Sequence, residues 1–316
     1  MAGLQQGRVT LWGIEVFLAV ADEGTISGAA KRLGVTPSAI SQQVSVIESA
    51  MGTLLLDRSA RPMHLTQAGL MFRRHAQTIL NAEAEARADL AMADLGGLTT
   101  LRLGMIEDFD NEVTPQLLST LAQDLKKCRF LLETGASHRL LDQLDSRALD
   151  MVVVTDMGPE SQGEAWREVH PLMEEPFMAI YPKGLENADL PLIQYTARHV
   201  MGRQIAAHLA RQNIRLAHRF ELDSYRAILA MVAGGQGWTI LPPLALHHAA
   251  RFHVSVTAAP LPFAPLSRRL SLIAREGVLR DVPGQIAAHL RGLIGERVIA
   301  PAHAQWPWIK GALALA

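Results

Sequence analysis

Apolar residues along the first ninety or so positions recur with the period of a helix, interrupted by one short basic turn. After the stretch LGGLTT they instead form short runs, namely LRLGMI, RFLLET and MVVVTD, separated by amphipathic stretches such as VTPQLLSTLAQDLKK. We place the boundary near Gly96 and Gly97. The short runs predict buried strands, and their alternation with helices predicts a mainly parallel sheet.

A second set of strand and helix patterns follows the first. It consists of FMAIYP, the helix RQIAAHLARQN, HRFEL, the helix SYRAILAMVAGG and WTILP, and it predicts a second α/β half. RRLSLIARE predicts another strand, and VPGQIAAHLRGLIGERV a closing helix that packs back on the first half. The tail IAPAHAQWPWIKGALALA fits neither pattern. Its Trp306 and Trp308 either anchor a partner or membrane surface or pack on the protein itself.

The segment TISGAAKRLGVTPSAISQQVSVIE predicts a helix, a glycine turn and a second helix. Thr36 and Pro37 form an N-cap and first-turn pair for the second helix. Along it, Ile40, Val44 and Ile47 recur every three to four residues and must face the core.

The opposite side of this second helix carries hydroxyl and amide groups, on Ser38, Gln42 and Ser45 with Ser41 flanking them. Such short groups can hydrogen-bond base edges in a major groove, and glutamine pairs particularly with adenine. Taken alone, the pattern equally fits an ordinary helical hairpin with a solvated polar face.

Positive charge lies beside this helix and not on it. LLLDRSARPMHLTQAG predicts a small β-wing, whose Arg58 and Arg61 flank a proline-containing turn and could reach the DNA backbone or a minor groove. Between Thr25 and His75, six cationic residues stand against two acidic ones, a local net charge of +4. Phosphate contacts position a protein and base contacts specify sequence, so this division suits a DNA-binding domain.

Three segments together resemble the LysR-type transcriptional regulators: FLAVADEGTISGAAKRLGVTPSAISQQVSVIE, LLLDRSARPMHLTQAG and MVAGGQGWTILP. The resemblance covers about Leu11 to Val298. It implies a multidomain fold, with a mainly α N-terminal winged helix-turn-helix, a long linker helix, and a two-lobed α/β effector-binding domain of the periplasmic-binding-protein type. It also implies a sequence-specific DNA-binding transcriptional regulator, allosterically controlled by a small molecule bound between the lobes.

The resemblance divides the chain into four parts. We expect the winged helix-turn-helix over 8–67, the linker and dimerisation helix over 68–96, the effector-binding domain over 97–298 with its second lobe at about 176–270, and an extension of unknown role over 299–316. The implied partners are interrupted palindromic double-stranded DNA, the small-molecule effector, RNA polymerase and further copies of the chain, as a homodimer or homotetramer.

The resemblance also assigns roles around the predicted reading helix. The expected base-reading residues are Thr36, Ser38, Ser41, Gln42 and Ser45, and the expected backbone or wing contacts are Ser27, Lys31, Arg32, Arg58 and Arg61.

One long helix is predicted after Thr66, an expected N-cap, because QAGLMFRRHAQTILNAEAEARADLAMADL lacks proline and is rich in helix formers. Phe72, Ile79 and Ala86 fall seven apart, with Ala82 near the other seam position, which resembles a coiled-coil interface of small residues. We expect this seam to pair with a second copy. The alternative is that it packs against its own domain.

Candidate ligand-binding residues follow from topology and from the family. In two-lobed α/β receptors the ligand lies between the lobes, where strand ends and helix N-termini supply hydrogen-bond donors. The segments EDFDNE, GASHR, QYTAR, LDSYR and GQGWT occupy such places. By similarity to the family, the expected effector-binding residues are Asp108, Phe109, Ser137, His138, Thr196, Ser224 and Trp238.

Four acidic residues, Glu107, Asp108, Asp110 and Glu112, cluster where the family often places a small hydroxyl residue. If two of them face the cleft, they oppose an anionic effector and favour one that is cationic, amine-bearing or rich in hydrogen-bond donors. The alternative is that they are solvated at a helix start, where their charge suits the helix dipole.

Composition and charge narrow the class of protein. A chain of 316 residues with 49% hydrophobic residues can bury a sizeable core in two or three domains. The formal net charge of -1 gives no global attraction to nucleic acid, so any basic patch must be local. With a single cysteine, no secretory pattern and no apolar run long enough to span a bilayer, we expect a cytoplasmic protein without a membrane partner.

Several chemical signals are weak. Cys128 could sense redox conditions but has no second cysteine, so a buried structural role is the simpler interpretation. The cluster of His247, His248 and His253 lacks thiolates and regular ligand spacing, and we assign no metal and no cofactor. AGGQGW follows a helix and is not a dinucleotide loop, and no nucleophile elbow is present.

Two hypotheses from different classes remain. The first is the transcriptional regulator. The alternative is a small-molecule-binding protein or an enzyme on a two-lobed α/β scaffold without DNA binding, in which the N-terminal helices serve only assembly. That alternative lacks a secretory signal and any catalytic constellation, so we expect a regulator and not an enzyme.

Overall fold

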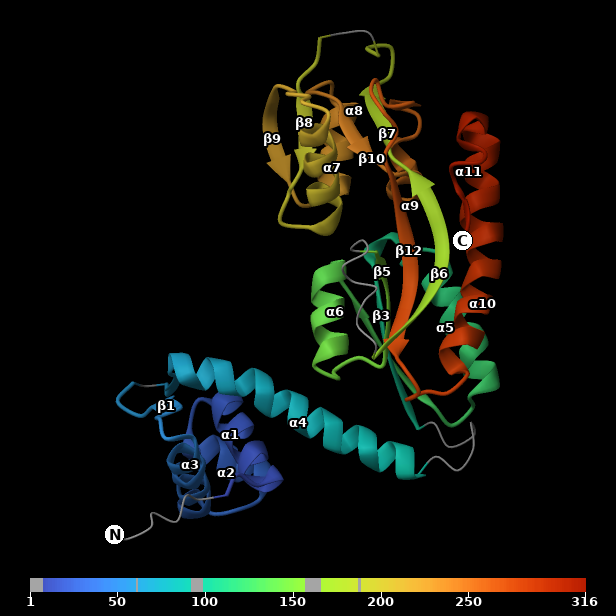
Figure 1. Ribbon diagram of the computed structural model, residues 1–316. Helices are drawn as coiled ribbons and strands as arrows, with labels where there is room; N and C mark the ends of the chain where they lie inside the picture. Colours follow the sequence, from blue (N-terminus) through green and yellow to red (C-terminus); the bar gives the residue numbers. More distant parts are fainter. Residues whose placement is uncertain (1–7, 61, 92–98, 157–165, 187–188) are drawn as a thin grey trace. The chain divides into compact units, whose positions relative to one another are not determined.

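The structure is a computed structural model that describes residues 8–60, 62–91, 99–156, 166–186 and 189–316. The chain forms two compact units, of which unit 1 contains residues 1–97 with 145–148 and unit 2 contains residues 98–144 with 149–316. Figure 1 shows the helices and strands of each unit.

Unit 1 is a helical domain with a two-stranded wing and a long helix. Its first three helices each begin at a threonine whose hydroxyl accepts a backbone N–H, and each ends at a glycine with a positive φ. These cap pairs are Thr10 and Gly24, Thr25 and Gly34, and Thr36 and Gly52. The elements are α1 (Leu11–Glu23), α2 (Ile26–Leu33), α3 (Pro37–Met51), β1 (Leu56–Asp57), β2 (His64–Leu65) and α4 (Gln67–Ala91).

The core of unit 1 joins the three short helices to the start of α4. The ring of Phe17 in α1 meets that of Phe72 in α4 edge to face, with centroids 5.0 Å apart. Gly69 is required where α4 crosses the strand that leads into the wing, because a Cβ there would lie 2.0 Å from the Leu55 carbonyl oxygen. As expected, the Thr66 hydroxyl caps α4 by accepting the Gly69 N–H at 3.0 Å.

The first lobe of unit 2 is a six-stranded sheet in the order β13-β6-β12-β5-β3-β4. The parallel pairing that we expected holds for the three strands from which it was predicted, because β3 is parallel to β4 and β5, whereas β12, β6 and β13 make the sheet as a whole mixed. The reason is that β6 and β12, which connect the two lobes, run antiparallel to each other (Figure 1). The strands are β3 (Thr100–Met105), β4 (Arg129–Thr134), β5 (Met151–Thr155), β6 (Arg167–Pro176), β12 (Ser267–Arg275) and β13 (Ala314–Leu315), and the helices are α5 (Val113–Asp124), α6 (Ser137–Asp145) and α10 (Val282–Ile294).

The second lobe lies between β6 and β12 in the sequence. It holds an antiparallel sheet in the order β10-β7-β11 and a parallel pair, β8 with β9. Its elements are β7 (Met178–Pro182), β8 (Leu192–Tyr195), α7 (Val200–Arg211), β9 (His218–Leu222), α8 (Tyr225–Ala233), β10 (Thr239–Leu241), α9 (Pro243–His248), a 3-10 turn (Ala250–Phe252) and β11 (Val256–Ala259).

The C-terminal tail is part of unit 2. Helix α10 continues through a π-helical turn (Gly295–Ile299) into α11 (Ala300–Gln305) without a break, and a 3-10 turn (Pro307–Ile309) then leads to β13. Trp306 is buried by packing against other parts of unit 2, including the ring of His253, whereas Trp308 is exposed. Strand β13 pairs with β6 and so covers the edge of the sheet. Among the described helices, none is both long and apolar enough to cross a bilayer.

Candidate DNA interface and ligand cleft

Helix α3 separates an apolar side from a polar one, as its sequence predicted. Ile40, Val44 and Ile47 are buried, whereas Ser38 and Gln42 are exposed. The side chain of Gln42 makes no hydrogen bond within the described part of the chain, so its amide is free to bind a ligand. This exposed face has the size and chemistry that suit a major groove.

The other predicted base-reading residues are partly occupied by local bonds. Thr36 accepts the Ala39 N–H at 3.3 Å, and its hydroxyl lies 3.0 Å from that of Ser38. Ser45 donates to the Ser41 carbonyl oxygen at 2.9 Å and accepts from Arg58 at 3.4 Å. Ser41 is half-buried. The helix therefore offers the free amide of Gln42, whereas the hydroxyls of Thr36, Ser38 and Ser45 already have local partners.

The predicted positive patch is smaller than the local charge count suggested. Arg32 contacts Asp22 at 3.3 Å and Glu23 at 3.6 Å, and Arg73 contacts Asp22 at 2.8 Å. Both acids lie just outside the segment that was counted. Lys31 is exposed, and in the described part of the chain it has no ion pair. Ser27, another predicted backbone contact, is also exposed.

The wing is anchored by a buried acid. Glu48 accepts the N–H groups of Leu55 and Leu56 at 2.9 and 3.1 Å through one oxygen, and its other oxygen accepts from Arg58 at 2.8 Å. Arg58, which was predicted to contact DNA, thus also forms an ion pair with Glu48, the acid that binds the backbone at the start of β1. Its side chain remains 42% exposed, so it can still approach a phosphate. Arg61, the other predicted wing contact, lies outside the described residues.

The predicted dimer seam of α4 is divided along the length of the helix. Phe72 packs on Phe17 in its own domain, so the alternative of intradomain packing accounts for this residue. Ile79 and Ala86 are exposed and Ala82 is half-buried. Met71, also exposed, lies on the same side of the helix as these three by the helical period.

A cleft in unit 2 holds a hollow of about 540 Å³, including its open mouth. Its walls come from the ends of β3, β5 and β8, the starts of α6 and α7, and the crossing strand β12. The lining residues are Ile106, Glu107, Asp108, Gly135, Ala136, Ser137, Thr155, Tyr195, His199, Val200, Met201, Asp223, Tyr225 and Arg268.

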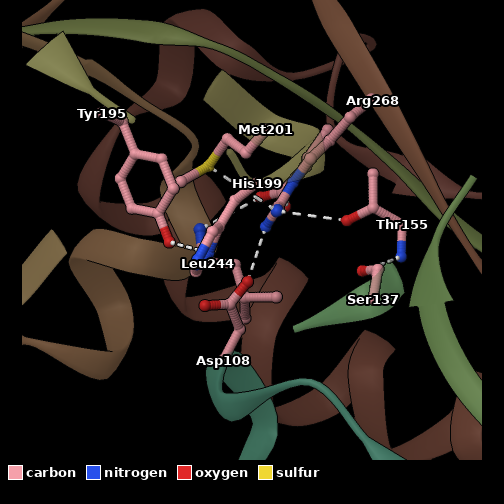
Figure 2. Close-up of polar contacts among 9 residues, drawn as sticks. Asp108, Ser137, Thr155, Tyr195, His199, Met201, Leu244 and Arg268 are labelled. Atoms are coloured by element: carbon pink, nitrogen blue, oxygen red, sulfur yellow. Dashed lines mark hydrogen bonds and ion pairs between the residues drawn. The ribbon is translucent and has the colours of Figure 1, made fainter. Parts of the chain in front are cut away.

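Asp108 and Ser137 are the two predicted effector-binding residues that line this hollow. Ser137 is buried and accepts the Thr155 N–H at 3.1 Å (Figure 2). His138 lies next to the cleft, with its ring 5.7 Å from that of His199. The other four predicted residues, Phe109, Thr196, Ser224 and Trp238, do not line the hollow.

Each of these four residues is engaged elsewhere. Phe109 is buried in the core. Thr196 is buried and donates to Glu221 at 2.7 Å. Ser224 is the N-cap of α8, and Trp238 stacks on Tyr181 with ring centroids 5.3 Å apart.

A buried ion-paired network closes one wall of the cleft (Figure 2). Arg268 in β12 donates to Glu175 in β6, its cross-strand neighbour, at 2.8 Å, and to Asp108 at 2.8 Å. Glu175 also accepts the Leu244 N–H at 3.0 Å. The Arg268 and Glu175 side chains are 3% and 0% exposed. Burial raises the pKa of Glu175, and the Arg268 guanidinium opposes that rise.

Two tyrosines and a histidine form another part of the lining. The Tyr195 hydroxyl lies 3.3 Å from His199 Nδ1 (Figure 2). Burial lowers the pKa of His199, and the neighbouring His138 ring adds to this effect, so the neutral imidazole is favoured. Tyr225 is 5% exposed, and its hydroxyl has no hydrogen-bond partner among the described residues.

Sequence reasoning missed Tyr195, His199, Asp223, Tyr225 and Arg268. Three of them stood within segments that had been selected, QYTAR and LDSYR, but a neighbouring hydroxyl residue was chosen in each. The available signal for Arg268 was an arginine at the start of an otherwise apolar strand.

The weaker chemical candidates lie outside the cleft. Cys128 is half-buried, and burial, together with the charge of Asp150, raises the pKa of its thiol. His248 accepts from or donates to Arg226, and His253 contacts the Leu246 carbonyl oxygen at 2.9 Å. The described residues contain no group of three or more histidine, cysteine or acidic side chains placed to hold a metal ion.

Two family models match the chain. The LysR substrate binding domain matches residues 96–285, and the bacterial regulatory helix-turn-helix protein of the lysR family matches residues 11–70. Together these matches contain both the cleft and helix α3.

Three relatives are similar to this chain over most of their length. A probable hydrogen peroxide-inducible genes activator of Mycobacterium avium is 30% identical over 310 residues, 92% of this chain and 94% of its own. The DNA-binding transcriptional dual regulator OxyR of Escherichia coli is 30% identical over 247 residues, 74% of this chain and 79% of its own. The HTH-type transcriptional regulator DgdR of Burkholderia cepacia is 28% identical over 236 residues, 73% and 76% of the two chains.

Solved structures show the same fold. A full-length OxyR of Pseudomonas aeruginosa, with a cysteine replaced by aspartate, has a TM-score of 0.65 at 21% identity over 90% of this chain and 95% of its own. CbnR in complex with its target DNA has a TM-score of 0.62 at 18% identity over 90% and 99% of the two chains. Helix-turn-helix, wing, long helix and two-lobed domain thus occur in the family's order. The chain belongs to the LysR family of DNA-binding transcriptional regulators.

Proposed function

We propose that this regulator reads its DNA target with the exposed polar face of α3 and changes its DNA binding when a small molecule occupies the cleft of unit 2. The observation that carries the reading role is that α3 buries Ile40, Val44 and Ile47 and exposes Ser38 and Gln42. Exposed amides and hydroxyls on a helix next to a wing are the groups that a major groove can accept.

Phosphate binding falls to residues around α3. Lys31 and Ser27 on α2, and Arg58 at the wing, are exposed and lie beside the proposed reading face in sequence and fold. The ion pairs of Arg32 and Arg73 are on the surface, where such pairs contribute about 0–1 kcal/mol, so phosphates can compete for both side chains. Arg61 keeps its predicted wing role as part of this proposal.

The proposed assembly is a homodimer or homotetramer. On α4, Met71, Ile79 and Ala86 are exposed on one side of the helix, and they offer a seam for a second copy. Strand β4 ends the first-lobe sheet with Leu131 and Leu132 each 40% exposed, a second surface suited to assembly. A symmetric dimer would place two α3 helices on two DNA half-sites.

The proposal includes RNA polymerase as a partner and the cytoplasm as the site of action, because a regulator acts where DNA is transcribed. The support for both is membership of the family.

The relatives' names raise peroxide as a candidate signal. One relative is named a probable activator of hydrogen peroxide-inducible genes, and another is named OxyR. This chain has one cysteine, so it cannot form an internal disulfide, and burial raises the pKa of that thiol. We infer that this protein responds to a non-covalent effector.

A gel-shift titration with the DNA upstream of the protein's own gene tests the reading role. The expected result is a complex that forms on this DNA far more tightly than on a scrambled sequence of equal length, with an affinity that falls as salt rises. Equal affinity for both DNAs would contradict sequence reading and favour the alternative, a two-lobed small-molecule-binding protein without DNA binding.

A further inference from the structure

The ligand cleft carries more negative than positive charge. Three acidic residues line it, Glu107, Asp108 and Asp223, whereas Arg268 is the only lining residue with a permanent positive charge among those described. His199, the one lining histidine, has a lowered pKa because of burial and therefore adds little positive charge near neutral pH.

The single arginine has no donor left for an anionic ligand. Its Nε and Nη2 contact Glu175 at 2.8 and 2.6 Å, and Nη2 also contacts Asp108 at 2.8 Å. Its Nη1 lies 3.4 Å from the Thr155 hydroxyl and 3.8 Å from the Met201 sulfur. All three nitrogens are engaged and the side chain is 3% exposed. The guanidinium therefore neutralises the carboxylates of Glu175 and Asp108 and does not offer its charge to a ligand in the cleft.

Two of the lining carboxylates lack a partner of their own. The side chains of Glu107 and Asp223 make no hydrogen bond or ion pair with any described residue. Burial, followed by the charge of Asp108, raises the pKa of Glu107, whereas the nearby Arg226 guanidinium opposes this rise. Arg226 also contacts His248.

A second observation points to a bound group at the same place. The Tyr225 side chain lines the cleft, and its buried hydroxyl has no partner at hydrogen-bond distance and angle among the described residues. The neighbouring Arg226 guanidinium lowers the pKa of this hydroxyl against the rise that burial causes. A buried hydroxyl without a partner costs free energy that a ligand could recover. Tyr195 adds a second aromatic ring to the lining, and aromatic rings beside carboxylates are the surroundings that ammonium groups favour.

The opposite wall contains the one feature that favours an anion. Ser137 stands at the N-terminus of α6, where unpaired backbone N–H groups and the helix dipole attract negative charge. Its hydroxyl oxygen already accepts the Thr155 N–H. This wall suits an oxygen on the ligand, yet it supplies no full positive charge against the three carboxylates.

We propose that the effector of this regulator carries a protonated amine, which binds at Glu107 and Asp223 with the Tyr225 hydroxyl as a further acceptor. This inference rests on the proposed function, because it names the chemical class that the cleft takes. The part of the effector that faces α6 is an oxygen-bearing group or an uncharged one.

Matched probes of opposite charge test the inference on the full-length protein. Each amine is paired with the carboxylate of the same carbon skeleton: butylamine with pentanoate, phenethylamine with hydrocinnamate, and putrescine with adipate. Binding is measured by calorimetry and by the thermal unfolding midpoint. We expect at least one amine to raise the midpoint by about 2 °C or more at saturation, with no rise from its carboxylate.

Two variants with the same charge change locate the binding. Glu107→Gln with Asp223→Asn should weaken the amine about tenfold or more. The control, Asp124→Asn with Glu296→Gln, removes two exposed carboxylates outside the cleft lining and should leave the affinity unchanged. Carboxylates that bind as tightly as amines, amines that bind equally to both double variants, or no binding by any amine would each overturn the inference.

The same protein preparation separates this inference from the proposed function. If the protein binds its own upstream DNA in a sequence-dependent way but binds only carboxylates, the proposed function holds and the amine inference is wrong. A protein that binds amines without any sequence-dependent DNA complex loses the proposed function instead.

Discussion

The exposed face of α3 and the cleft of unit 2 are both polar, yet they are built in opposite ways. On α3 the side chains are uncharged and exposed, and Gln42 has no partner in the described chain. In the cleft wall, Arg268, Asp108 and Glu175 are charged, largely buried and bonded to one another. The exposed face of α3 leaves the Gln42 amide free, although several of its hydroxyls have local partners, whereas the charged groups of the cleft wall are bonded to one another.

This difference predicts how the two regions respond to substitution. An exposed polar group can be removed with little change in stability, so its loss should change mainly the specificity of DNA binding. Members of a buried charged network depend on one another, so the loss of one should lower the free energy of unfolding, and the effects of several substitutions should not add.

The largest effect is expected from Arg268→Ala. This change leaves the fully buried Glu175 and the largely buried Asp108 without their cation, which should lower the free energy of unfolding by about 3–5 kcal/mol. Arg269→Ala is the matched control, because Arg269 is the next residue in β12 but is exposed and pairs with Glu174 at 3.6 Å. Its loss should lower the free energy of unfolding by about 1 kcal/mol or less. Denaturant unfolding measures both, and equal losses would remove the contrast between buried and exposed charge.

A smaller effect, on recognition alone, is expected from Gln42→Ala. Loss of one amide contact to a base should reduce discrimination by about 1–3 kcal/mol at one position of the DNA site, with stability unchanged. Lys31→Ala should instead weaken all DNAs alike and lower the salt slope by about 1. Gln116→Ala, which removes an exposed helical glutamine in unit 2, should change neither property. Competition gel shifts with single-base variants of the site provide the measurement.

A pH dependence is expected from Glu107. Burial and the charge of Asp108 raise its folded-state pKa above the ordinary value of 4.5, so the folded state holds this proton more tightly than the unfolded chain. Stability from this group is therefore present at low pH and is lost as pH rises from 4.5 through the raised pKa. Glu107→Gln should flatten this part of the curve of unfolding free energy against pH. Asp110, whose pKa is also raised by burial, keeps the remaining slope.

The smallest effect is expected from Cys128→Ser. Because burial raises the pKa of this thiol and the chain has no second cysteine, peroxide should leave DNA binding unchanged in both the native protein and the variant. Gel shifts before and after peroxide treatment, with mass spectrometry of Cys128, test this. A peroxide response that the variant loses would show that the single cysteine is a sensor.

The sequence was informative about α3 because local helix geometry alone decides which residues lie on the same side of a helix. The 3.6-residue period assigns Ile40, Val44 and Ile47 to one side and Gln42 to the other, whatever the rest of the chain does. The same local reasoning identified Thr36 and Thr66 as caps.

The cleft was less predictable because its chemistry depends on residues far apart in the chain. Arg268 and Asp108 are 160 positions apart, and no local pattern indicates that they pair. Thr196 and Ser224 look like ligand contacts in the sequence, but Glu221 occupies the first hydroxyl and the backbone of α8 the second. Likewise, Asp22 lay outside the counted basic segment and yet pairs with two of its arginines.

The C-terminal strand β13 has a practical consequence for work with isolated fragments. A fragment cut at residue 285, where the family match ends, would lose most of α10 and the strand that covers β6. The backbone groups of β6 that now pair with β13 would then form an open edge, to which other β-strands can add. Solubility screens of the effector domain should therefore retain the chain through Leu315, and shortened versions are expected to precipitate.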